Sequence, residues 1–510
     1  MSPRRAVRVG RVISRFGLTL ASAAEMSAIR FPTRAGIVDD GGSLTYAELR
    51  DVSVAVATVL HEEHGVREGA RLGVLCRNHR DFVIASVAGS RLGADLVLLS
   101  TDLGVVSLGQ VLHRERVDVV VLDEEFIDLR DRAGTGGPWV TGPELRTLAA
   151  GKTASTLSPP GSRGRLVVLT SGTTGVPKGA PRGAGELRMG LPVTSLLAAL
   201  RLRSGQPMVI QPPLFHGFGL GFLAAALTLG CPAILARRLD GQHALELVDR
   251  HRATVLACVP VLLHRIMAVP PELRTRYEIS SLRAVVSGGA PLRPALAHAV
   301  MAEYGDVLFD LYGTTEAGWA TLATPDDLRA APGTVGRPAH GIRIAVLDSA
   351  GDPLPPDVPG EIYIGSRLSF RGYTGGGSKR VVRGLMSTGD VGWLDTQGRL
   401  FVAGRADEMV VSGGENVYPQ EVEDALAEHP AVADVAVVGV PDPEFGQRLA
   451  ARVVRKDQVT ADELRAHVAG VLGRHKVPRD VEFVDALPRT STGKARRPTA
   501  AVRSAGSGPA

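Results

Sequence analysis

The sequence predicts an α/β protein built on largely parallel β-sheets, and three observations support this class. Apolar runs of strand length alternate with longer amphipathic runs along most of the chain, a pattern typical of parallel sheets covered by helices. Hydrophobic residues make up 44% and charged residues 22% of the chain, as in globular proteins. The length of 510 residues exceeds one typical hydrophobic core, so we expect at least two domains.

The individual elements are predicted from two periodicities. Short apolar runs bounded by glycine, proline or polar residues fit strands that are buried on both faces. Runs in which apolar residues recur every three or four positions fit amphipathic helices. Strands are therefore expected at 71–76, 118–122, 165–169, 232–236 and 255–260, and helices at 81–93 and 244–253.

The pattern changes at residues 404–407, where a smaller unit begins. Helical and strand-like runs alternate over 422–441, 463–478 and 480–488, which predicts a small α+β domain. We therefore expect an N-terminal domain at 1–404, with a flexible leader at 1–34, and a C-terminal domain at 405–510. The last residues, 498–510, are rich in Ala, Gly, Pro and Ser, which predicts a disordered tail.

Charge and cysteine content exclude several classes of function. The net charge of +5 is spread along the chain without a dense basic block, so we do not expect a nucleic-acid partner. The three cysteines are too few and too scattered for a disulfide framework or a zinc site, which favours a reducing, cytoplasmic location. They are Cys76, Cys231 and Cys258.

Two segments have some features of membrane or export signals. The N-terminal segment 1–26 is basic, but Arg11 and Arg15 interrupt its apolar patch, which disfavours export. Residues 217–236 carry no charge, yet their glycines and Pro232 divide them into a loop, a short buried helix and a strand. We therefore expect no integral membrane span, while peripheral association through a lipid substrate stays open.

A small polar loop follows the strand at 165–169. Its sequence, LTSGTTGVPKGA, occupies residues 169–180 and combines glycines, hydroxyl residues and Lys178. Glycines let the backbone approach an anion closely, and backbone N–H groups, hydroxyls and the lysine can bind phosphate oxygens. Gly179 follows the lysine, so the loop is not the GxxxxGK[ST] motif of P-loop NTPases. A flexible surface linker is the alternative interpretation.

The loop resembles the phosphate-loop signature of the adenylate-forming superfamily, which comprises acyl-CoA synthetases, adenylation domains of peptide synthetases and luciferases. The resemblance extends from about residue 35 to residue 497, and further motifs follow in the order of the family. These motifs are PLFHGFG at 213–219, SGGAPL at 287–292, LYGTTE at 311–316, STGD at 387–390, GRADEMVVSGGENVYPQEVE at 404–423 and PRTSTGK at 488–494.

The resemblance implies a large multi-sheet N-terminal domain, a small mobile α+β C-terminal domain and a reaction in two steps. A carboxylate attacks the α-phosphate of ATP to give an acyl-adenylate and pyrophosphate, and the thiol of coenzyme A then displaces AMP. By resemblance, Lys494 bridges the carboxylate and the α-phosphate, Thr315 binds that phosphate, and Glu316 holds Mg²⁺, a cation that prefers oxygen ligands. His216 is expected at the mouth of the acyl pocket, although a lone histidine in an apolar segment is often a core residue.

Other residues receive roles from the same resemblance. Tyr312 stacks on adenine, Asp390 and Arg405 bind the ribose, Asp407 is the hinge, and an apolar pocket holds the acyl group. The remaining ATP or AMP contacts are Thr170, Ser171, Gly172, Thr173, Thr174, Gly175, Lys178, Gly288, Gly289, Ala290, Gly313 and Thr314; the coenzyme A tunnel is lined by Ser412, Gly413 and Gly414, and the acyl pocket by Phe215, Phe218 and Val259.

The predicted activity is that of an AMP-forming acyl-CoA ligase for a fatty or other apolar carboxylic acid. No charged residue in the apolar stretches 213–229 and 255–263 suits an amino-group anchor, which disfavours amino-acid substrates. Two alternatives stay open. The acyl group could pass to a carrier-protein thiol, or the chain could bind nucleotide and acyl groups without turnover.

Overall fold

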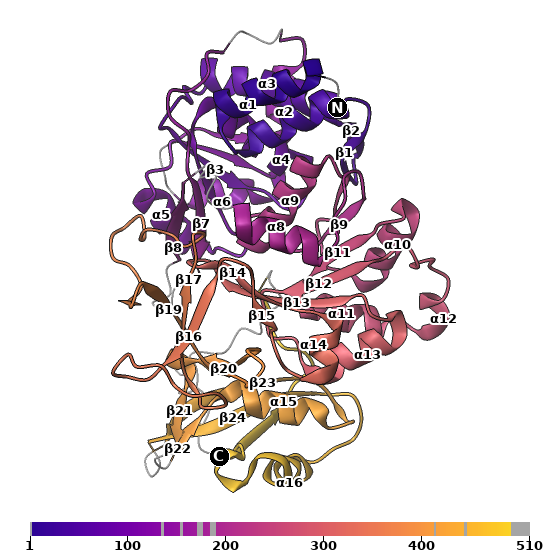
Figure 1. Cartoon of the computed structure of the whole chain (residues 1–510), viewed down its shortest axis with the longest axis vertical. Helices are drawn as coiled ribbons and strands as arrows, with labels where there is room; N and C mark the ends of the chain where they lie inside the picture. Colours follow the sequence, from indigo (N-terminus) through magenta and orange to yellow (C-terminus); the bar gives the residue numbers. More distant parts are fainter. Residues whose placement is uncertain are drawn as a thin grey trace, which may run out of the picture.

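The computed structural model describes residues 3–133, 137–152, 157–170, 177–183, 190–412, 415–442 and 446–490. Within these residues four β-sheets are arranged along the long axis of the molecule, with the N-terminal helices at one end and the C-terminal sheet at the other (Figure 1).

The first sheet has the strand order β6-β5-β3-β4-β7-β8. Its strands are parallel except for β8, which turns back antiparallel to β7. The hairpin of β7 and β8 carries the predicted phosphate loop at its turn. The strands are β3 (Arg71–Leu75), β4 (Asp95–Leu98), β5 (Val119–Leu122), β6 (Trp139–Thr141), β7 (Leu166–Thr170) and β8 (Lys178–Arg182).

The second sheet has the order β15-β14-β13-β12-β11-β9-β10-β1-β2 and is parallel from β13 to β1. Parallel strands bring their carboxyl ends to one edge, so the segments that follow β9, β11 and β12 meet there. The strands are β1 (Ala35–Asp39), β2 (Gly42–Thr45), β9 (Met208–Ile210), β10 (Ala233–Leu235), β11 (Val255–Cys258), β12 (Ala284–Gly288), β13 (Leu308–Thr314), β14 (Gly318–Ala323) and β15 (Arg337–Pro338).

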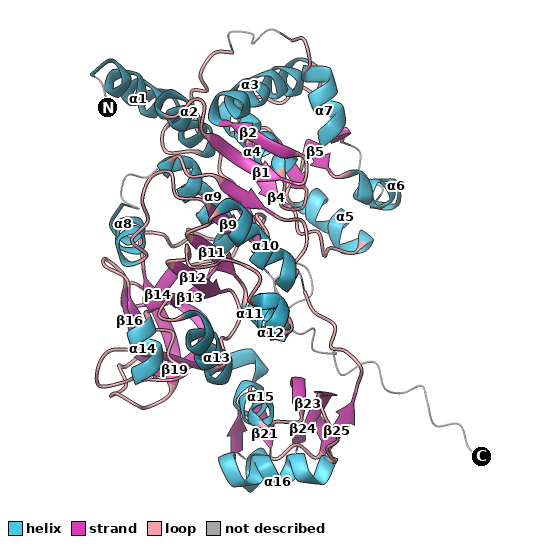
Figure 2. Ribbon diagram, turned by 90° about the vertical axis from the view of Figure 1, so that its right-hand side faces the viewer, coloured by secondary structure: helices cyan, strands magenta, loops and turns pink. Residues whose placement is uncertain are grey.

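Helices cover both faces of these two sheets (Figure 2). Several begin at the capping residues that their sequences predict. Thr45 and Glu48, for example, form a reciprocal capping box at the start of α3. The helices are α1 (Pro3–Phe16), α2 (Leu20–Arg30), α3 (Tyr46–Glu62), α4 (Arg80–Leu92), α5 (Val105–Arg114), α6 (Ile127–Ala133), α7 (Gly142–Ala149), α8 (Gly190–Ala199), α9 (Gly217–Leu229), α10 (Gly241–His251), α11 (Pro260–Ala268), α12 (Pro271–Arg274), α13 (Pro294–Tyr304) and α14 (Pro325–Ala330).

The main hydrophobic core lies between the two sheets. Successive side chains of a strand point to opposite faces of its sheet, so alternate residues enter this core. Val119 and Val121 of β5 face this central core, whereas Val120 and Leu122 face a second cluster on the outer side. Because both faces of the strand are covered, its sequence is an uninterrupted apolar run rather than an alternating one. The central core also holds buried residues of α2, α3, α4 and α9.

A third sheet follows, built from antiparallel strands of one region of the chain. It places Asp390 of its long strand opposite Arg405 of the last strand. The strands are β16 (Arg343–Leu347), β17 (Gly360–Gly365), β18 (Val381–Val382), β19 (Leu385–Leu394) and β20 (Leu400–Arg405).

The C-terminal sheet pairs β22-β21-β24-β23, with β25 parallel to β24. Two helices pack on it around a separate small core, in agreement with the α+β unit predicted for this region. The elements are β21 (Val410–Ser412), β22 (Glu415–Val417), α15 (Pro419–Glu428), β23 (Val432–Asp442), β24 (Gly446–Arg455), α16 (Ala461–Leu472) and β25 (Asp480–Phe483). The α/β class with a large N-terminal and a small C-terminal part is confirmed.

Within the predicted flexible leader, residues 3–16 and 20–30 are helical. They form α1 and α2, which pack together through Val12, Phe16, Met26 and Ile29, and α2 joins the central core. The uncharged segment 217–236 forms α9 and β10. Among the described residues, no helix is long and apolar enough to cross a membrane.

Candidate active site

A large cleft of about 2680 Å³ lies where the three N-terminal sheets meet the C-terminal part. Its walls include Thr170, Lys178, Tyr312 and Glu316 from the N-terminal sheets and Thr490 from the C-terminal region. Most of the predicted site residues that the structure describes line this one cleft, although they come from motifs separated by hundreds of residues.

The predicted ribose and adenine residues meet at one corner of the cleft. The Tyr312 hydroxyl donates a hydrogen bond to Oδ2 of Asp390 at 2.6 Å, and the Arg405 guanidinium reaches Oδ1 of the same carboxylate at 3.2 Å. Asp390 is only 8% exposed. A carboxylate with so little contact with water needs a neighbouring cation, here Arg405, to stabilise its negative charge. Lys379, which the sequence did not single out, donates to the Thr388 carbonyl at 3.3 Å beside this pair.

The charges at this corner stabilise each other. Burial opposes the charge on Arg405, but its hydrogen bonds with Asp407 and the charge of Asp390 outweigh burial and raise the pKa of Arg405. Burial and the Asp390 carboxylate raise the pKa of Tyr312, which keeps its hydroxyl protonated as a donor. The corner therefore presents a fixed carboxylate beside an aromatic ring.

A second group lies on the side of the cleft that carries Thr170 and Lys178, which flank the predicted phosphate loop; we call it the phosphate side. The Tyr373 hydroxyl donates to Oε1 of Glu316 at 2.8 Å, and Nζ of Lys178 lies 5.5 Å from the centre of the Tyr373 ring. Burial and the Glu316 carboxylate raise the pKa of Tyr373. The half-buried Arg182 donates to the Thr315 and Leu368 carbonyls, which fixes the segment before Glu316. Burial lowers the pKa of Arg182, and the charge of Glu316 counteracts this effect.

Glu316 suits the predicted Mg²⁺ role. Within the described part of the chain its Oε2 has no hydrogen-bond partner, which leaves a carboxylate oxygen of the kind that Mg²⁺ prefers. No group of three or more His, Cys, Asp or Glu side chains that could hold a metal occurs among the described residues. Mg²⁺ often binds through one or two carboxylates and substrate phosphates, and when bound here it would neutralise polyphosphate charge.

The β7–β8 hairpin, which flanks the predicted phosphate loop, is fixed by contacts within the hairpin and with neighbouring segments. Thr170 and Lys178 face each other across β7 and β8, and the Thr170 hydroxyl donates to the Lys178 carbonyl at 3.2 Å. A Cβ on Gly179 would lie 2.6 Å from Oγ1 of Thr374 and 2.7 Å from Oε1 of Glu115, so a larger residue would displace these side chains. The predicted contacts Ser171, Gly172, Thr173, Thr174 and Gly175 lie outside the described residues.

The predicted base-binding segment ends β12. Gly289 adopts a φ of 80°, and it lines the cleft together with Ala290. Gly288 is packed more tightly: a Cβ there would lie 2.9 Å from the Leu311 carbonyl oxygen and 3.3 Å from Cζ of Phe218. Position 313 also requires glycine, because a Cβ added there would lie 2.3 Å from the Gly318 carbonyl oxygen.

The predicted hydroxyls on the 311–316 motif have different surroundings. Thr315 lines the cleft beside Glu316. Oγ1 of Thr314 accepts a hydrogen bond from the Ala317 amide at 3.0 Å, so this hydroxyl fixes the turn between β13 and β14 while the residue borders the cleft. Asp310 lies earlier on the same strand, β13. It is buried, and burial raises its pKa to about 7.

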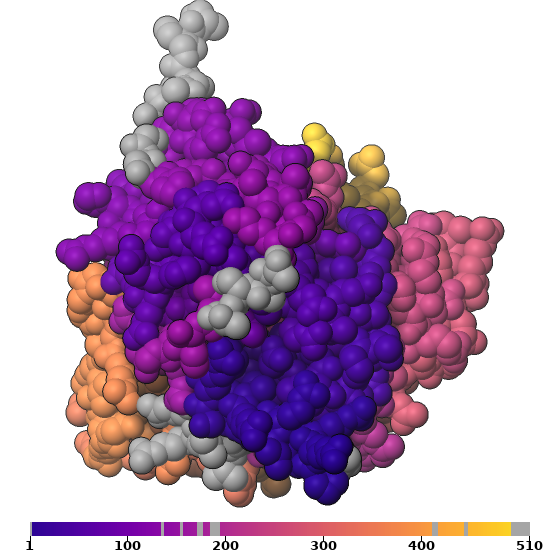
Figure 3. Space-filling view, turned by 90° about the horizontal axis from the view of Figure 1, so that it is seen from above, coloured from indigo at the N-terminus to yellow at the C-terminus, as the bar shows by residue number. Residues whose placement is uncertain are grey.

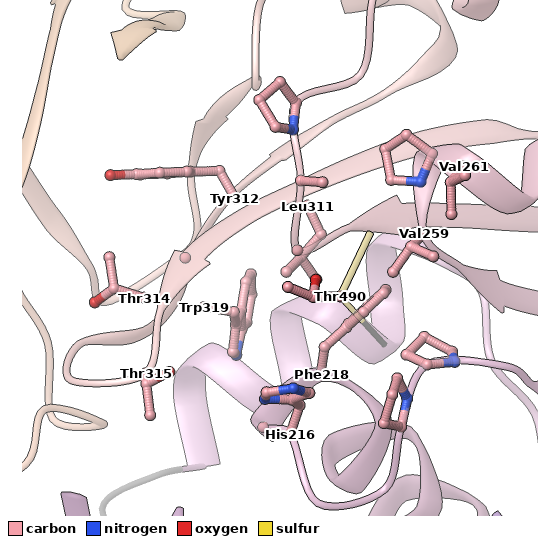
Figure 4. Close-up of a pocket in the computed structure, with 18 of the residues that line it drawn as sticks. His216, Phe218, Val259, Val261, Leu311, Tyr312, Thr314, Thr315, Trp319 and Thr490 are labelled. Carbon is pink, nitrogen blue, oxygen red and sulfur yellow. The ribbon is translucent and has the colours of Figure 1, made fainter. Parts of the chain in front are cut away.

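The apolar wall of the cleft contains Phe218, Val259, His216 and Trp319 (Figure 4). Phe218 packs edge-on against Phe222 one turn further along α9, with ring centres 5.5 Å apart. His216 occupies the N-cap position of α9, without a capping hydrogen bond from its side chain. Tyr312 points away from this group (Figure 4). The predicted acyl-pocket residue Phe215 lies instead in the central core, with 3% of its surface exposed.

The C-terminal region reaches the cleft through the segment before the predicted Lys494. Thr490 borders the cleft, and the Arg489 guanidinium forms an ion pair with Asp434 of β23. Lys494, Gly413 and Gly414 lie outside the described residues, so their roles stay predictions. Asp407 lies in a short 3₁₀ turn and accepts from Arg405, and Ser412 pairs within the C-terminal sheet.

Sequence analysis did not single out several cleft residues whose contacts are described above or that form the aromatic wall. These are Arg182, Trp319, Tyr373 and Lys379. Tyr373 and Lys379 lie in a glycine-rich stretch that follows a strand, which is a usable signal for close backbone approach to a ligand. Trp319 lies three residues beyond the 311–316 motif, on the returning strand of the same hairpin. Arg182 has no local signal, because its partners come from distant segments.

The four sheets, the small C-terminal α+β unit and the paired anionic and cationic groups of the cleft define an adenylate-forming enzyme. The chain belongs to the AMP-binding enzyme family, whose model matches residues 24–374, and the model of the AMP-binding enzyme C-terminal domain matches residues 421–494. This result confirms the resemblance inferred from the motifs.

Individual relatives cover almost the whole chain. A feruloyl-CoA synthase from Amycolatopsis sp is 33% identical and is aligned over 91% of this chain and 94% of its own length. A fatty acid–[acyl-carrier-protein] ligase, ScoC, from Streptomyces coeruleorubidus is 28% identical over 94% and 95% of the two chains. The o-succinylbenzoate CoA synthetase from Bacillus subtilis, solved with its acyl-adenylate intermediate, superposes with a TM-score of 0.82 at 27% identity over 93% and 96%. The prediction of an acid–thiol ligase is confirmed at this level.

Proposed function

We propose that the chain is an AMP-forming carboxylate–CoA ligase whose preferred substrate is an apolar aromatic carboxylic acid. In this proposal the acid and ATP react in the cleft to give an acyl-adenylate and pyrophosphate. The thiol of coenzyme A then attacks the acyl carbon, the acyl–oxygen bond to AMP breaks, and the thioester leaves together with AMP.

Charge repulsion is the main obstacle to the first step. Two unit charges about 4 Å apart repel by roughly 4 kcal/mol at an effective dielectric of 20, and the polyphosphate carries several charges. Lys178 and Arg182 supply fixed positive charge on the phosphate side, and Lys379 and Arg405 do so near the ribose corner. We further propose that Lys494 adds the charge between the carboxylate and the α-phosphate.

The ribose corner supports the nucleotide assignment. Asp390 is held in place by Tyr312 and Arg405, so its carboxylate is oriented before a ligand arrives. A preoriented carboxylate accepts hydrogen bonds from ribose hydroxyls at little entropic cost. Tyr312 leaves its ring face for the base, because its hydroxyl is already bonded to Asp390.

The apolar wall supports an aromatic acid. Phe218 and Trp319 offer two aromatic surfaces at the cleft, and aromatic rings in contact contribute about 0.5–1.5 kcal/mol beyond the area that they bury. Two of the relatives are named for aromatic acids, feruloyl-CoA synthase and o-succinylbenzoate CoA synthetase. The fatty-acid prediction from the sequence is retained as the second candidate, and the cleft lining also includes aliphatic residues such as Leu220 and Leu229.

The acceptor thiol has two candidates as well. Coenzyme A is favoured by the feruloyl-CoA synthase and o-succinylbenzoate CoA synthetase relatives, whereas the ScoC relative is named for a carrier-protein acceptor. We place the reaction in the cytoplasm, since Cys76, Cys231 and Cys258 are free and buried. Hinge motion about Asp407, with Ser412, Gly413 and Gly414 lining the thiol path, is part of the same proposal.

The observation that carries the proposal is that Tyr312, Asp390, Glu316 and Lys178 line one cleft, whose lining also includes Phe218. The test is a pyrophosphate-release assay over cinnamic and benzoic acids and over fatty acids of graded length. Highest kcat/KM for an aromatic acid supports the substrate assignment, and a maximum for a long-chain fatty acid contradicts it. Release without any added acid, or no release with any of them, contradicts the adenylation step.

The acceptor and the role of Lys494 need separate measurements. Free coenzyme A should discharge the adenylate, and transfer only to a carrier protein bearing the phosphopantetheine arm would contradict the first acceptor assignment. Lys494→Ala should abolish adenylation and largely spare thioester formation from supplied acyl-adenylate. Equal loss of both steps would contradict the role of Lys494.

A further inference from the structure

The N-terminal helix α1 carries a concentrated positive charge that the proposed reaction does not use. Its fourteen residues, PRRAVRVGRVISRF, include five arginines and no acidic residue. All five arginines are exposed. Figure 2 shows α1 projecting beside α2 at the end of the molecule far from the C-terminal sheet, and Figure 3 shows the N-terminal segment as a broad part of that end surface.

The arginines are not distributed around the helix at random. At 100° per residue, Arg4, Arg8, Arg11 and Arg15 fall on one face. The apolar residues Val9, Val12, Ile13 and Phe16 form a different face that packs with α2. We call the first face the arginine face, and it points away from the packed side of α1.

The arginine face is poorly neutralised by the rest of the protein. Within the described residues, Arg4, Arg8 and Arg11 form no ion pair, and Arg15 donates to the Leu157 carbonyl. Residues 1–38 contain seven arginines and one acidic residue, a net charge of +6, which exceeds the +5 of the whole chain. The one acidic residue, Glu25, is paired with Arg91.

Two apolar features accompany this charge. Val7 lies on the same side as Arg4 and Arg11 and is 56% exposed. Leu18, two residues after the end of α1, is 39% exposed, and it lines the cleft together with Leu20 and Met26. The C-terminal end of the arginine face, at Arg15, is therefore close in the chain to this apolar part of the cleft lining.

We propose that the arginine face of α1 is a docking surface for a bilayer that contains anionic phospholipids. Arginine guanidinium groups bind lipid phosphates through paired hydrogen bonds, and basic residues on a helix are attracted to an anionic membrane surface. An exposed valine in the middle of the charge fits a bilayer, into which it can insert, better than a nucleic acid. The apolar end of the cleft then lies close to the membrane, where an apolar acid is concentrated. The docking itself does not depend on the proposed activity.

The test is co-sedimentation of the full-length chain with large vesicles. Vesicles of phosphatidylcholine with roughly 30% phosphatidylglycerol are compared with pure phosphatidylcholine at two salt concentrations. The triple variant Arg4→Gln, Arg8→Gln and Arg11→Gln removes the centre of the arginine face. A matched triple variant, Arg67→Gln, Arg132→Gln and Arg276→Gln, removes the same charge from exposed sites on other elements that do not line the cleft.

Each basic residue near an anionic surface contributes about a five-fold change in binding, so the α1 variant should bind roughly a hundred-fold more weakly. The matched variant should bind much as the unchanged chain does, higher salt should weaken binding, and both variants should keep their circular dichroism spectra. Equal loss in both variants, or no preference for anionic over neutral vesicles, would overturn the proposal. So would tighter binding to duplex DNA than to anionic vesicles, with that binding lost in the α1 variant. If the α1 variant loses its spectrum, Val7→Asp alone must weaken vesicle binding for the proposal to stand.

Discussion

Substitution of Tyr373 by phenylalanine removes one hydroxyl from the phosphate side of the cleft. That hydroxyl donates to Oε1 of Glu316 at 2.8 Å, while the ring contacts Phe370 and lies near Lys178. Phenylalanine keeps the ring, so the change isolates the hydrogen bond. A hydrogen bond to a charged group contributes about 1.5–3 kcal/mol, and every 1.4 kcal/mol is ten-fold. If Glu316 must be held to bind Mg²⁺, kcat/KM for ATP should fall by about 10- to 100-fold.

The assay follows pyrophosphate release while the Mg²⁺ concentration is varied. The Mg²⁺ concentration at half-maximal rate should rise in Tyr373→Phe, while KM for the carboxylic acid stays nearly unchanged. Tyr363→Phe is the matched control, because the Tyr363 hydroxyl also donates to a glutamate oxygen, Oε2 of Glu361, at 2.8 Å. Tyr363 lies on β17, the strand before the segment that holds Tyr373, and it does not line the cleft. An unchanged Mg²⁺ dependence in Tyr373→Phe, or an equal effect in Tyr363→Phe, would refute the positioning of Glu316 by Tyr373.

Three further predictions concern the pocket, the base site and the buried carboxyl. Trp319→Ala should raise KM for an aromatic acid by about 10-fold or more, because a ring contact is lost, and leave KM for ATP unchanged in steady-state assays. Gly288→Val should reduce ATP binding in calorimetry, since even a Cβ there lies 2.9 Å from the Leu311 carbonyl; wild-type affinity would contradict the tight packing. Burial raises the pKa of Asp310 to about 7 from 3.8, so the folded state binds a proton that the unfolded state has released between these values. Protonation of Asp310 therefore contributes fully to the free energy of unfolding below pH 4. This contribution falls by up to about 4 kcal/mol as the pH rises to 7. Asp310→Asn should therefore be more stable than the unchanged chain at pH 8 and not at pH 4 in urea unfolding, and an equal difference at both pH values would contradict the raised pKa.

The fold class followed from the sequence because strand and helix periods are local properties. The apolar runs at 118–122 and 255–260 correspond to β5 and β11, buried on both faces as their composition indicates. The N-terminus was harder, because α1 is a helix whose burial depends on α2. A basic segment with a short apolar patch has the same local pattern whether it packs or remains extended.

The candidate site was predictable where a motif fixes both residue type and local geometry. The pairing of Asp390 with Tyr312 and Arg405 joins three such motifs. Phe215 shows the limit of this reasoning. A Cβ on Gly219 would lie 2.4 Å from the Pro212 carbonyl oxygen and 2.5 Å from that of Pro213, so the backbone approaches itself closely at the start of α9. Within this tight segment Phe215 lies in the core, whereas Phe218 lines the cleft.

Contacts between distant segments could not be predicted from one sequence. Tyr373 meets Glu316 and Lys178 only because the third sheet packs beside the first. Arg182 is similar, since its position in the cleft depends on hydrogen bonds to the carbonyls of Thr315 and Leu368, which lie far away in the sequence.

The formation of an acyl-adenylate in the cleft is the central claim, and an isotope measurement tests it most directly. A carboxylic acid labelled with ¹⁸O in both carboxylate oxygens is incubated with ATP, Mg²⁺ and coenzyme A, and the nucleotide product is analysed by mass spectrometry. Attack of the carboxylate on the α-phosphate transfers one labelled oxygen, so AMP should be heavier by the mass of one ¹⁸O substitution. Unlabelled AMP, or label in inorganic phosphate together with ADP, would contradict adenylation as the chemistry of this site.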